Sequence, residues 1–238
     1  LNNFWDMPIR FVCLGNSFKE GGRCLAGIEI DDNNNPVINN GRPKWIRPIC
    51  DTPHGEVPTH LVANINLLDL IEIDGLKIPA SLGYQSENVL FDTDSIEIIG
   101  HYNGDLNPFC DRRGLIFGNR GKAVSQEAIN NLTYSLMLVS TNEFEIIEKV
   151  YDDCPERPQI RLIFDYRGNN YDLPITDPEF LRRYRQNPDF LNNVNHVFLS
   201  LSLGVCWNDW YYKLVAGIIQ PVIIAPENNN EYDDDLPF

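Results

Sequence analysis

Side chains that could carry out catalysis occur in this sequence without the spacing that catalytic motifs need. The segment Gly118-Asn119-Arg120-Gly121-Lys122 is similar to a phosphate-binding loop, but Ile116 stands where that motif needs Gly and Ala123 where it needs Ser or Thr. The sequence also has no G-x-S-x-G elbow and no H-E-x-x-H pair. The motifs therefore favour a protein that is not an enzyme.

Metal-ligating side chains are equally dispersed. Zinc sites need ligands in closely spaced pairs, and the sequence has no C-x-x-C. We expect no metal and no cofactor, and we expect free thiols in a reducing cytoplasm. The residues concerned are Cys13, Cys24, Cys50, Cys110, Cys154, Cys206, His54, His60, His101 and His196.

Basic side chains gather in windows that contain aromatic residues and few acids. Proteins that bind single strands combine a positive groove with aromatic rings on which bases stack, at about 1–3 kcal/mol per base. This pattern predicts single-strand binding, although an ordinary charged surface over core aromatics remains open as the alternative. The windows hold Arg42, Lys44 and Arg47 beside Trp45, then Arg112, Arg113, Arg120 and Lys122 beside Phe117, and lastly Arg182, Arg183 and Arg185 beside Tyr184.

The densest aromatic stretch is Trp207-Asn208-Asp209-Trp210-Tyr211-Tyr212, at the tip of an expected hairpin. Successive side chains on a strand face opposite ways, so some of these rings must lie in the core. The other face offers stacking positions for bases. Trp207, Trp210 and Tyr211 are the candidates.

Composition restricts the kind of partner. The chain of 238 residues has 34 acidic and 19 basic side chains, a net charge of -15, and 43% hydrophobic residues, enough for a packed core. Such an acidic protein should not bind nucleic acid indiscriminately. No apolar run reaches the roughly 20 residues of a membrane-spanning helix. No signal peptide is visible, so we expect a cytoplasmic protein without membrane contact.

Short strands separated by turn residues predict the fold. Such spacing is typical of a small barrel or a sandwich rather than of βαβ units. Asp177-Pro178-Glu179 has the residues that begin a helix, and Pro188 should end it. A second helix is expected over residues 122–132. The expected strands are residues 9–14, 23–30, 45–49, 67–73, 89–99, 134–139, 143–150, 160–166, 170–173, 197–203 and 211–219.

The two halves show a weak internal similarity. Residues 11–14 and 24–28 parallel residues 198–201 and 214–218, each as an apolar strand, a polar tip and an apolar-Ala-Gly-Ile strand. Five strands and one helix per half suit the OB fold. The expected fold class is mainly β, with two OB-like barrels joined by a short helix and a disordered acidic tail. The expected divisions are a leader or expression remnant at 1–7, a first barrel at 8–110, a connector at 111–132, a second barrel at 133–220 and the tail at 221–238.

The C-terminus carries the most specific signal in the sequence. It resembles the tip of bacterial single-stranded-DNA-binding proteins, which ends Asp-Asp-Asp-Ile-Pro-Phe and recruits repair and replication enzymes. The resemblance implies that Phe238 enters an apolar pocket, that its carboxylate meets a basic residue, and that the acids meet a basic rim. The matching residues are Asp233, Asp234, Asp235, Leu236, Pro237 and Phe238.

Residues 8–220 resemble a second family, the prokaryotic dual OB domain-containing proteins. The similarity lies in residues 11–19, 21–28, 45–49 and 53–57 and in the late hairpin 204–219. It implies two OB folds and a nucleic-acid-binding or sensing role in defence settings. By its pattern a shared site is expected at Asn16, Ser17, Lys19, Arg23, Trp45, Arg47 and His54.

Together these signals predict a cytoplasmic dual OB protein that binds single-stranded DNA, with RNA left open. In this hypothesis the tail recruits DNA-repair and replication enzymes. The rival hypothesis is an adaptor or decoy that uses the same tail without contacting DNA, and the net acidity favours it. In the first hypothesis the phosphate contacts are Arg23, Lys44, Arg47, Arg112, Arg113, Arg120 and Lys122.

Overall fold

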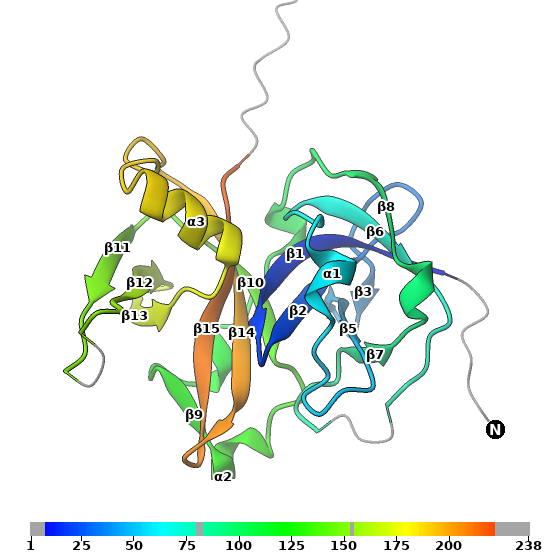
Figure 1. Ribbon diagram of the computed structural model, residues 1–238, viewed down its shortest axis with the longest axis horizontal. Coiled ribbons are helices and arrows are strands. Elements are labelled where there is room, and N and C mark those ends of the chain that lie inside the picture. The colour runs from blue at the N-terminus through cyan, green and yellow to red at the C-terminus, as the bar shows by residue number, and fades with distance from the viewer. Residues whose placement is uncertain (1–7, 80–82, 153–154, 222–238) are drawn as a thin grey trace, which may run out of the picture.

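The chain folds as two β-barrels that pack side by side (Figure 1). The structure is a computed structural model that describes residues 8–79, 83–152 and 155–221. The expectation of a mainly β protein with two OB-like barrels is confirmed. No helix in these three ranges is long and apolar enough to cross a membrane. The expected leader and the acidic tip lie outside the described residues.

The first barrel has the strand connectivity of an OB fold. Its first three strands form an antiparallel meander, the fourth pairs with the first, and the fifth closes the barrel by running parallel to the third, where Arg47 is opposite Asn88. A further strand lies on the free edge of the fourth. The elements are β1 (Ile9–Lys19), β2 (Gly22–Glu29), the small hairpin β3 (Ile38–Asn39) and β4 (Arg42–Pro43), β5 (Trp45–Ile49), α1 (Thr59–Val62), β6 (Asp69–Ile73), β7 (Asn88–Leu90) and the edge strand β8 (Glu97–His101).

The second barrel repeats this connectivity. A meander of three strands leads through a helix to a long hairpin, and a parallel bridge between Ile175 and Val215 closes the barrel. Its first strand is bent into two pieces, of which the first pairs with the fourth strand of the barrel. The elements are β10 (Leu136–Thr141), β11 (Phe144–Lys149), β12 (Gln159–Tyr166), β13 (Asn169–Pro174), α3 (Pro178–Gln186), β14 (Val197–Trp207) and β15 (Trp210–Ile219).

The segment between the barrels differs from the expected helix over residues 122–132. It forms a strand, β9 (Ala123–Ser125), and only one helical turn, α2 (Gln126–Ile129). β9 pairs with the start of β15, with Tyr211 opposite Val124, because β14 pairs with only one edge of β15 and leaves the other edge free. Three 3₁₀ turns complete the chain, at Thr93–Ser95, Asn107–Phe109 and Ile116–Gly118.

Helix α3 begins where the sequence predicted. The Asp177 carboxylate accepts hydrogen bonds from the backbone N–H groups of Glu179 and Phe180, both at 3.0 Å, and Pro178 occupies the first helical position. The helix ends at Gln186, two residues before Pro188. Capping chemistry is local, which explains why sequence located this element accurately.

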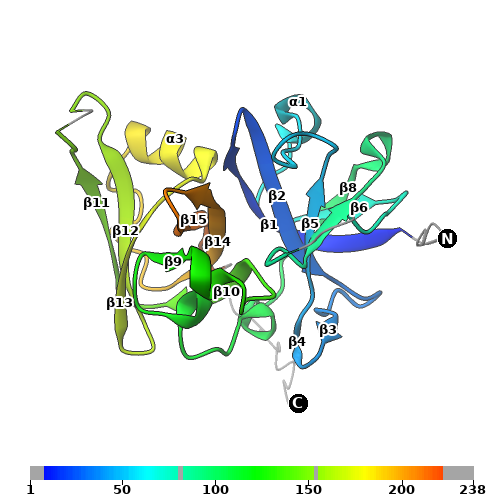
Figure 2. The same ribbon diagram turned by 90° about the horizontal axis from the view of Figure 1, so that it is seen from below.

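Strand β1 is buried on both faces, which explains its unbroken apolar run. Phe11 and Cys13 point into the core of the first barrel, whereas Val12 and Leu14 point the other way. There they join Phe198 and Ile219 of the second barrel in a third core cluster. In both ribbon views β1 lies beside β14 and β15 (Figure 2). The two barrels therefore share a hydrophobic interface.

The two segments that are similar in sequence do not occupy equivalent places in the two barrels. β1–β2 supplies the first two strands of its barrel, whereas β14–β15 supplies the last two of the other. Each hairpin has a shift in register beside a glycine, at Gly15 in one and opposite Gly217 in the other. These glycines lie where the hairpins cross. The shared pattern thus marks the surface on which the two barrels meet.

Candidate nucleic-acid interface

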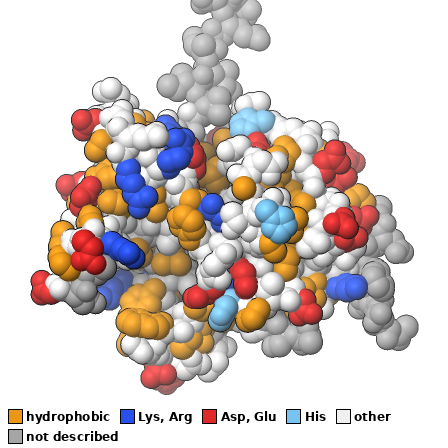
Figure 3. Space-filling model, in the orientation of Figure 1, with side chains coloured by type: hydrophobic (Ala, Val, Ile, Leu, Met, Phe, Trp, Pro, Cys, Tyr) orange, Lys and Arg blue, Asp and Glu red, His pale blue; other side chains and the backbone are white. Residues whose placement is uncertain are grey.

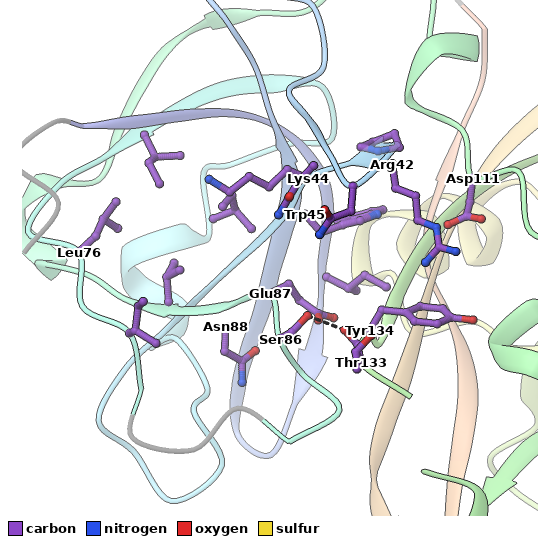
Figure 4. Close-up of a pocket in the computed structure, with 18 of the residues that line it drawn as sticks. Arg42, Lys44, Trp45, Leu76, Ser86, Glu87, Asn88, Asp111, Thr133 and Tyr134 are labelled. Atoms are coloured by element: carbon purple, nitrogen blue, oxygen red, sulfur yellow. Dashed lines mark hydrogen bonds between the residues drawn. The ribbon is translucent and has the colours of Figure 1, made fainter. Parts of the chain in front are cut away.

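A cavity of about 460 Å³ lies between β5, β7, the β3–β4 hairpin, the connecting segment at Asp111 and Arg113, and the residues that lead into β10. We call it the Trp45 groove and define it by Arg42, Lys44, Trp45, Arg113 and Tyr134. Figure 4 shows the Arg42 side chain extending toward Asp111, with Trp45 and Tyr134 on either side of it. The groove thus brings three predicted residues, Lys44, Trp45 and Arg113, together with two further groups suited to a nucleic acid.

Most of the cations in this groove already have a protein partner. The Lys44 ammonium lies 2.5 Å from a Glu29 carboxylate oxygen, and Arg113 pairs with Asp111. The Arg113 guanidinium also lies over the Tyr134 ring, 3.5 Å from its centroid. Burial raises the pKa of the Tyr134 hydroxyl, while the Arg113 and Arg42 charges act to lower it. Tyr134 is therefore a neutral, half-buried ring with the Arg113 guanidinium over one face, which leaves its other face for stacking on a base.

Asn16 and Arg23 lie in a second cavity of about 430 Å³, the α3 cleft, between α1 and α3. The Asn16 amide donates hydrogen bonds to the carbonyls of Val62 and Ile65, at 2.8 and 2.9 Å, and so ties β1 to the end of α1. The Arg23 guanidinium lies over the exposed Phe18 ring, 4.6 Å from its centroid. Asn16 therefore has a structural role in addition to its predicted one.

Ser17, Lys19 and Arg47 line a third cavity of about 260 Å³, which we call the Arg47 pocket. It lies between the tip of the β1–β2 hairpin and the outer half of β14–β15. Arg47 is only 1% exposed, and the carboxylate of Glu87 lies 3.7 Å from its guanidinium. Arg47 is thus enclosed at the base of the pocket, where a strand passing over the surface does not reach it.

The aromatic tip of β14–β15 divides its side chains as expected. Trp207 and Trp210 are 64% and 46% exposed, whereas Tyr211 is buried, packs edge-on against Tyr84 and donates to the Gln126 side-chain oxygen. On the face shown in Figure 3, hydrophobic side chains gather near the foot of the view, over this tip. Tyr211 is therefore part of the core, and of the three candidates Trp207 and Trp210 remain available to a ligand.

The remaining predicted residues lie apart from the three cavities. Arg112, Arg120 and Lys122 are exposed, and Lys122 precedes β9 beside the aromatic tip. His54 is in an exposed turn. The predicted residues thus spread over three cavities and one hairpin tip rather than one continuous groove. Tyr134 was missed because a single tyrosine before a strand carries no sequence signal, and Arg42 was noted only as part of a basic window.

Within the described ranges, no three His, Cys, Asp or Glu side chains gather as metal ligands would. What the cavities offer instead is positive charge, aromatic rings and hydrogen-bond donors. These groups can hold an anion and a planar ring.

Comparison with known proteins gives a family match and several distant structural ones. The family model described as Dual OB-containing domain matches residues 9–218. No curated protein matches the chain in sequence.

Among solved structures, "Crystal structure of the tetrameric p202 HIN2" is 9% identical, with 90% of each chain covered and a TM-score of 0.30. "Structure and Conformational Change of a Replication Protein A Heterotrimer Bound to ssDNA" is 12% identical, covering 85% of this chain and 45% of that one at a TM-score of 0.35. "Crystal structure of Ifi202 HINa domain in complex with 20bp dsDNA" is 12% identical, covering 88% and 91% at 0.31. At such low TM-scores, these structural similarities give no information about the function of this chain.

Proposed function

This chain belongs to the family of dual OB-containing domains, and from that premise we propose that it binds single-stranded nucleic acid, DNA in the first place, in the Trp45 groove. The observation that carries the proposal is the meeting of Trp45 and Tyr134 with Arg42, Lys44 and Arg113 around one cavity. Stacked rings hold bases regardless of sequence, and the cations neutralise the backbone. The protein acts by binding, without catalysis.

The net charge of -15 does not oppose binding at a local groove. Five of the acids lie in the last twelve residues, and Glu29 and Asp111 are each paired with a cation of the groove. Repulsion between the acidic surface and a strand is long-range and weakens with salt, whereas stacking acts at contact. Binding should therefore be specific for flexible single strands that fit the groove.

Titration of a fluorescein-labelled dT15 at 50 and 200 mM NaCl tests the proposal directly. If three cations contact phosphates, the slope of log affinity against log salt is about -2, so affinity falls on the order of tenfold between the two conditions. No binding at micromolar protein would overturn the proposal. Equal affinity for rU15 would overturn the preference for DNA.

We further propose that the C-terminal tip recruits enzymes of DNA repair and replication. The support is the sequence alone, because Leu236, Pro237 and Phe238 lie outside the described residues. A pull-down comparing the full chain with one lacking residues 236–238 tests this. We expect the shortened chain to lose repair enzymes and to keep its affinity for dT15. Identical partners for both chains would contradict the proposal.

An adaptor or decoy that uses the tip without contacting DNA is the rival candidate. The observation that favours it is the acidity of the chain, with 34 acidic against 19 basic side chains. The two candidates differ in a single measurement. Tip-dependent capture of repair enzymes, together with no affinity for dT15 or rU15 at either salt concentration, would establish the rival.

A further inference from the structure

Arg47 is a buried cation whose hydrogen-bonding groups are poorly satisfied. A guanidinium has five N–H donors, and a good N–H···O hydrogen bond spans 2.7–3.2 Å. Its contacts are all longer: 3.4 Å to the Ser202 hydroxyl, 3.5 Å to the Asn88 side-chain oxygen and 3.7 Å to the Glu87 carboxylate. Its Nε atom is buried without a hydrogen-bond partner among the described residues.

Glu87 does not complete the coordination of Arg47. One of its carboxylate oxygens is engaged elsewhere, and the other, Oε2, is buried without a hydrogen-bond partner among the described residues. The engaged oxygen, which is also the one nearest to Arg47, accepts hydrogen bonds from the backbone N–H of Ser135, at 2.9 Å, and from the Ser135 hydroxyl. Leaving a buried donor without an acceptor is unfavourable, and more so when the group is charged. In this geometry Arg47 therefore keeps hydrogen-bonding capacity for a further acceptor.

A second cation faces the same pocket. Lys19 lines the cavity and is half-buried there. Burial lowers the pKa of its ammonium and the charge of Arg47 lowers it further, whereas Cys24, Glu56 and Glu20 act to raise it. Two cations that repel one another across a cavity are both stabilised when an anion lies between them.

The rim of the pocket is apolar and aromatic. Phe18 is 57% exposed at the β1–β2 tip, and Val205 and Tyr212 line the opposite side, with the Trp207 ring 6.0 Å from that of Tyr212. A cavity of about 260 Å³ has room for one phosphate and one ring system but not for a length of strand. The planar guanidinium of arginine can donate two parallel hydrogen bonds to phosphate oxygens, and exposed aromatic rings can stack on bases.

We propose that the Arg47 pocket is a second ligand site, which binds one nucleoside monophosphate group with its phosphate between Arg47 and Lys19 and its base against the Phe18–Tyr212 rim. The group is either a free nucleotide or the 5′-phosphorylated end of a strand. Because β1 and β14–β15 belong to different barrels, the ligand contacts both. The site is separate from the Trp45 groove and does not depend on binding there.

Calorimetric titration of the full chain with dTMP, thymidine and inorganic phosphate tests the free nucleotide. Titration with 5′-phosphorylated and 5′-hydroxyl dT10 tests the strand end. We expect dTMP to bind at least tenfold more tightly than thymidine and inorganic phosphate, or 5′-phosphorylated dT10 to bind at least tenfold more tightly than 5′-hydroxyl dT10. Absence of both preferences would overturn the proposal, and so would equal affinity for dTMP and inorganic phosphate.

Variants of the pocket identify the site. Lys19→Gln should weaken binding of the phosphorylated ligand at least fivefold, and Glu20→Gln, which removes a rim carboxylate, should strengthen it. Lys149→Gln, an exposed change outside the pocket, is the control and should have no effect. Arg47→Met should abolish binding, but Lys19→Gln alone decides the matter if Arg47→Met fails to fold. An unchanged affinity in Lys19→Gln would contradict the proposal.

These results are distinguishable from a failure of the proposed function. 5′-Hydroxyl dT15 should bind the Lys19→Gln variant as it binds the unchanged protein, because that strand uses the Trp45 groove. Loss of both activities in Lys19→Gln would show one continuous site and overturn the separate pocket.

Discussion

The backbone carbonyl oxygen of Leu14 lies so close to Gly217 that a Cβ atom at position 217 would stand 2.6 Å from it. Leu14 is in the first barrel and Gly217 in the second, so this contact sets how closely the barrels approach. The reciprocal position, Gly15, is opposite Ala216, whose Cβ would lie 3.8 Å from a Cβ at position 15. The barrels are therefore held by backbone packing as well as by the cluster around Val12 and Ile219.

Gly217→Ala should destabilise the whole chain. The added methyl must push β15 away from β1, and overpacking of this kind typically costs about 1–3 kcal/mol. Urea denaturation followed by tryptophan fluorescence measures the free energy of unfolding. Gly114→Ala is the matched control, because nothing lies within 4 Å of a Cβ there. Equal stability of the two variants would show that the barrels tolerate separation.

The sequence predicted single elements better than it predicted how they combine. Asp177 and Pro178 predict the start of α3 because capping is a local interaction. Residues 123–125 were expected to be helical, but the free edge of β15 made them a strand, and no local pattern reveals such an edge. Tertiary packing outweighs helix propensity in so short a segment.

For the candidate site, too, the sequence predicted individual residues better than it predicted which of them lie together. Basic and aromatic windows identified Lys44, Trp45 and Arg113, which share one groove. Arg47 stands two residues from Trp45, so strand alternation alone would place both side chains on one face of β5. Arg47 nevertheless lines a different cavity, beside the point where β5 pairs with β7 at Asn88. Tyr134 enters the groove only because the connecting segment returns past β5, which depends on the arrangement of both barrels.

Tyr134→Leu should weaken binding of dT15 roughly 5- to 100-fold. The substitution removes a stacking ring that is worth about 1–3 kcal/mol, while leucine retains part of the packing. Fluorescence anisotropy of the labelled oligonucleotide measures the change. Tyr151→Leu removes a tyrosine that is 39% exposed and lines none of the three cavities, so its affinity should stay within twofold. Parallel losses in both variants would indicate nonspecific stacking.

Arg42→Gln should reduce the salt dependence of binding. Each lost phosphate contact removes about 0.7 from the slope of log affinity against log salt for a single strand. Arg157→Gln, at an exposed position outside the groove, should leave the slope unchanged. Titrations at four salt concentrations between 50 and 300 mM measure both slopes. A slope that Arg42→Gln does not alter would remove Arg42 from the set of phosphate contacts.

Asp177→Ala should cost about 1–2 kcal/mol of stability, because two backbone N–H groups at the start of α3 lose their acceptor. Asp177→Asn should cost much less, since an amide oxygen caps equally well. Burial raises the pKa of the Asp177 carboxyl, so the folded state holds this proton more tightly than the unfolded state does. Its contribution to stability therefore declines as pH rises through the acidic range. Urea denaturation of the unchanged protein and both variants at pH 4.5 and 7 tests whether Asp177→Ala loses more stability than Asp177→Asn.

Lys213 is a fully buried ammonium in the second barrel that pairs with no carboxylate in the described part of the chain. It donates hydrogen bonds to the Ile116 carbonyl at 2.7 Å, the Asn119 carbonyl at 2.8 Å and the Asn119 side-chain oxygen at 3.0 Å. These bonds fix the connecting segment against β15. Burial lowers the pKa of Lys213 to about 7, far below that of a lysine in an unfolded chain.

Between pH 7 and about 10 the unfolded chain therefore keeps a proton that the folded chain has released. Stability rises with pH wherever the unfolded state binds more protons, by at most about 1.4 kcal/mol per pH unit for one group. The free energy of unfolding of the unchanged protein, minus that of Lys213→Met, should thus increase from pH 7 to pH 9. Subtraction removes the other titrating groups, because both proteins share them. Urea denaturation at pH 7, 8 and 9 measures the difference, and a constant or falling value would show that Lys213 keeps its proton in the folded state.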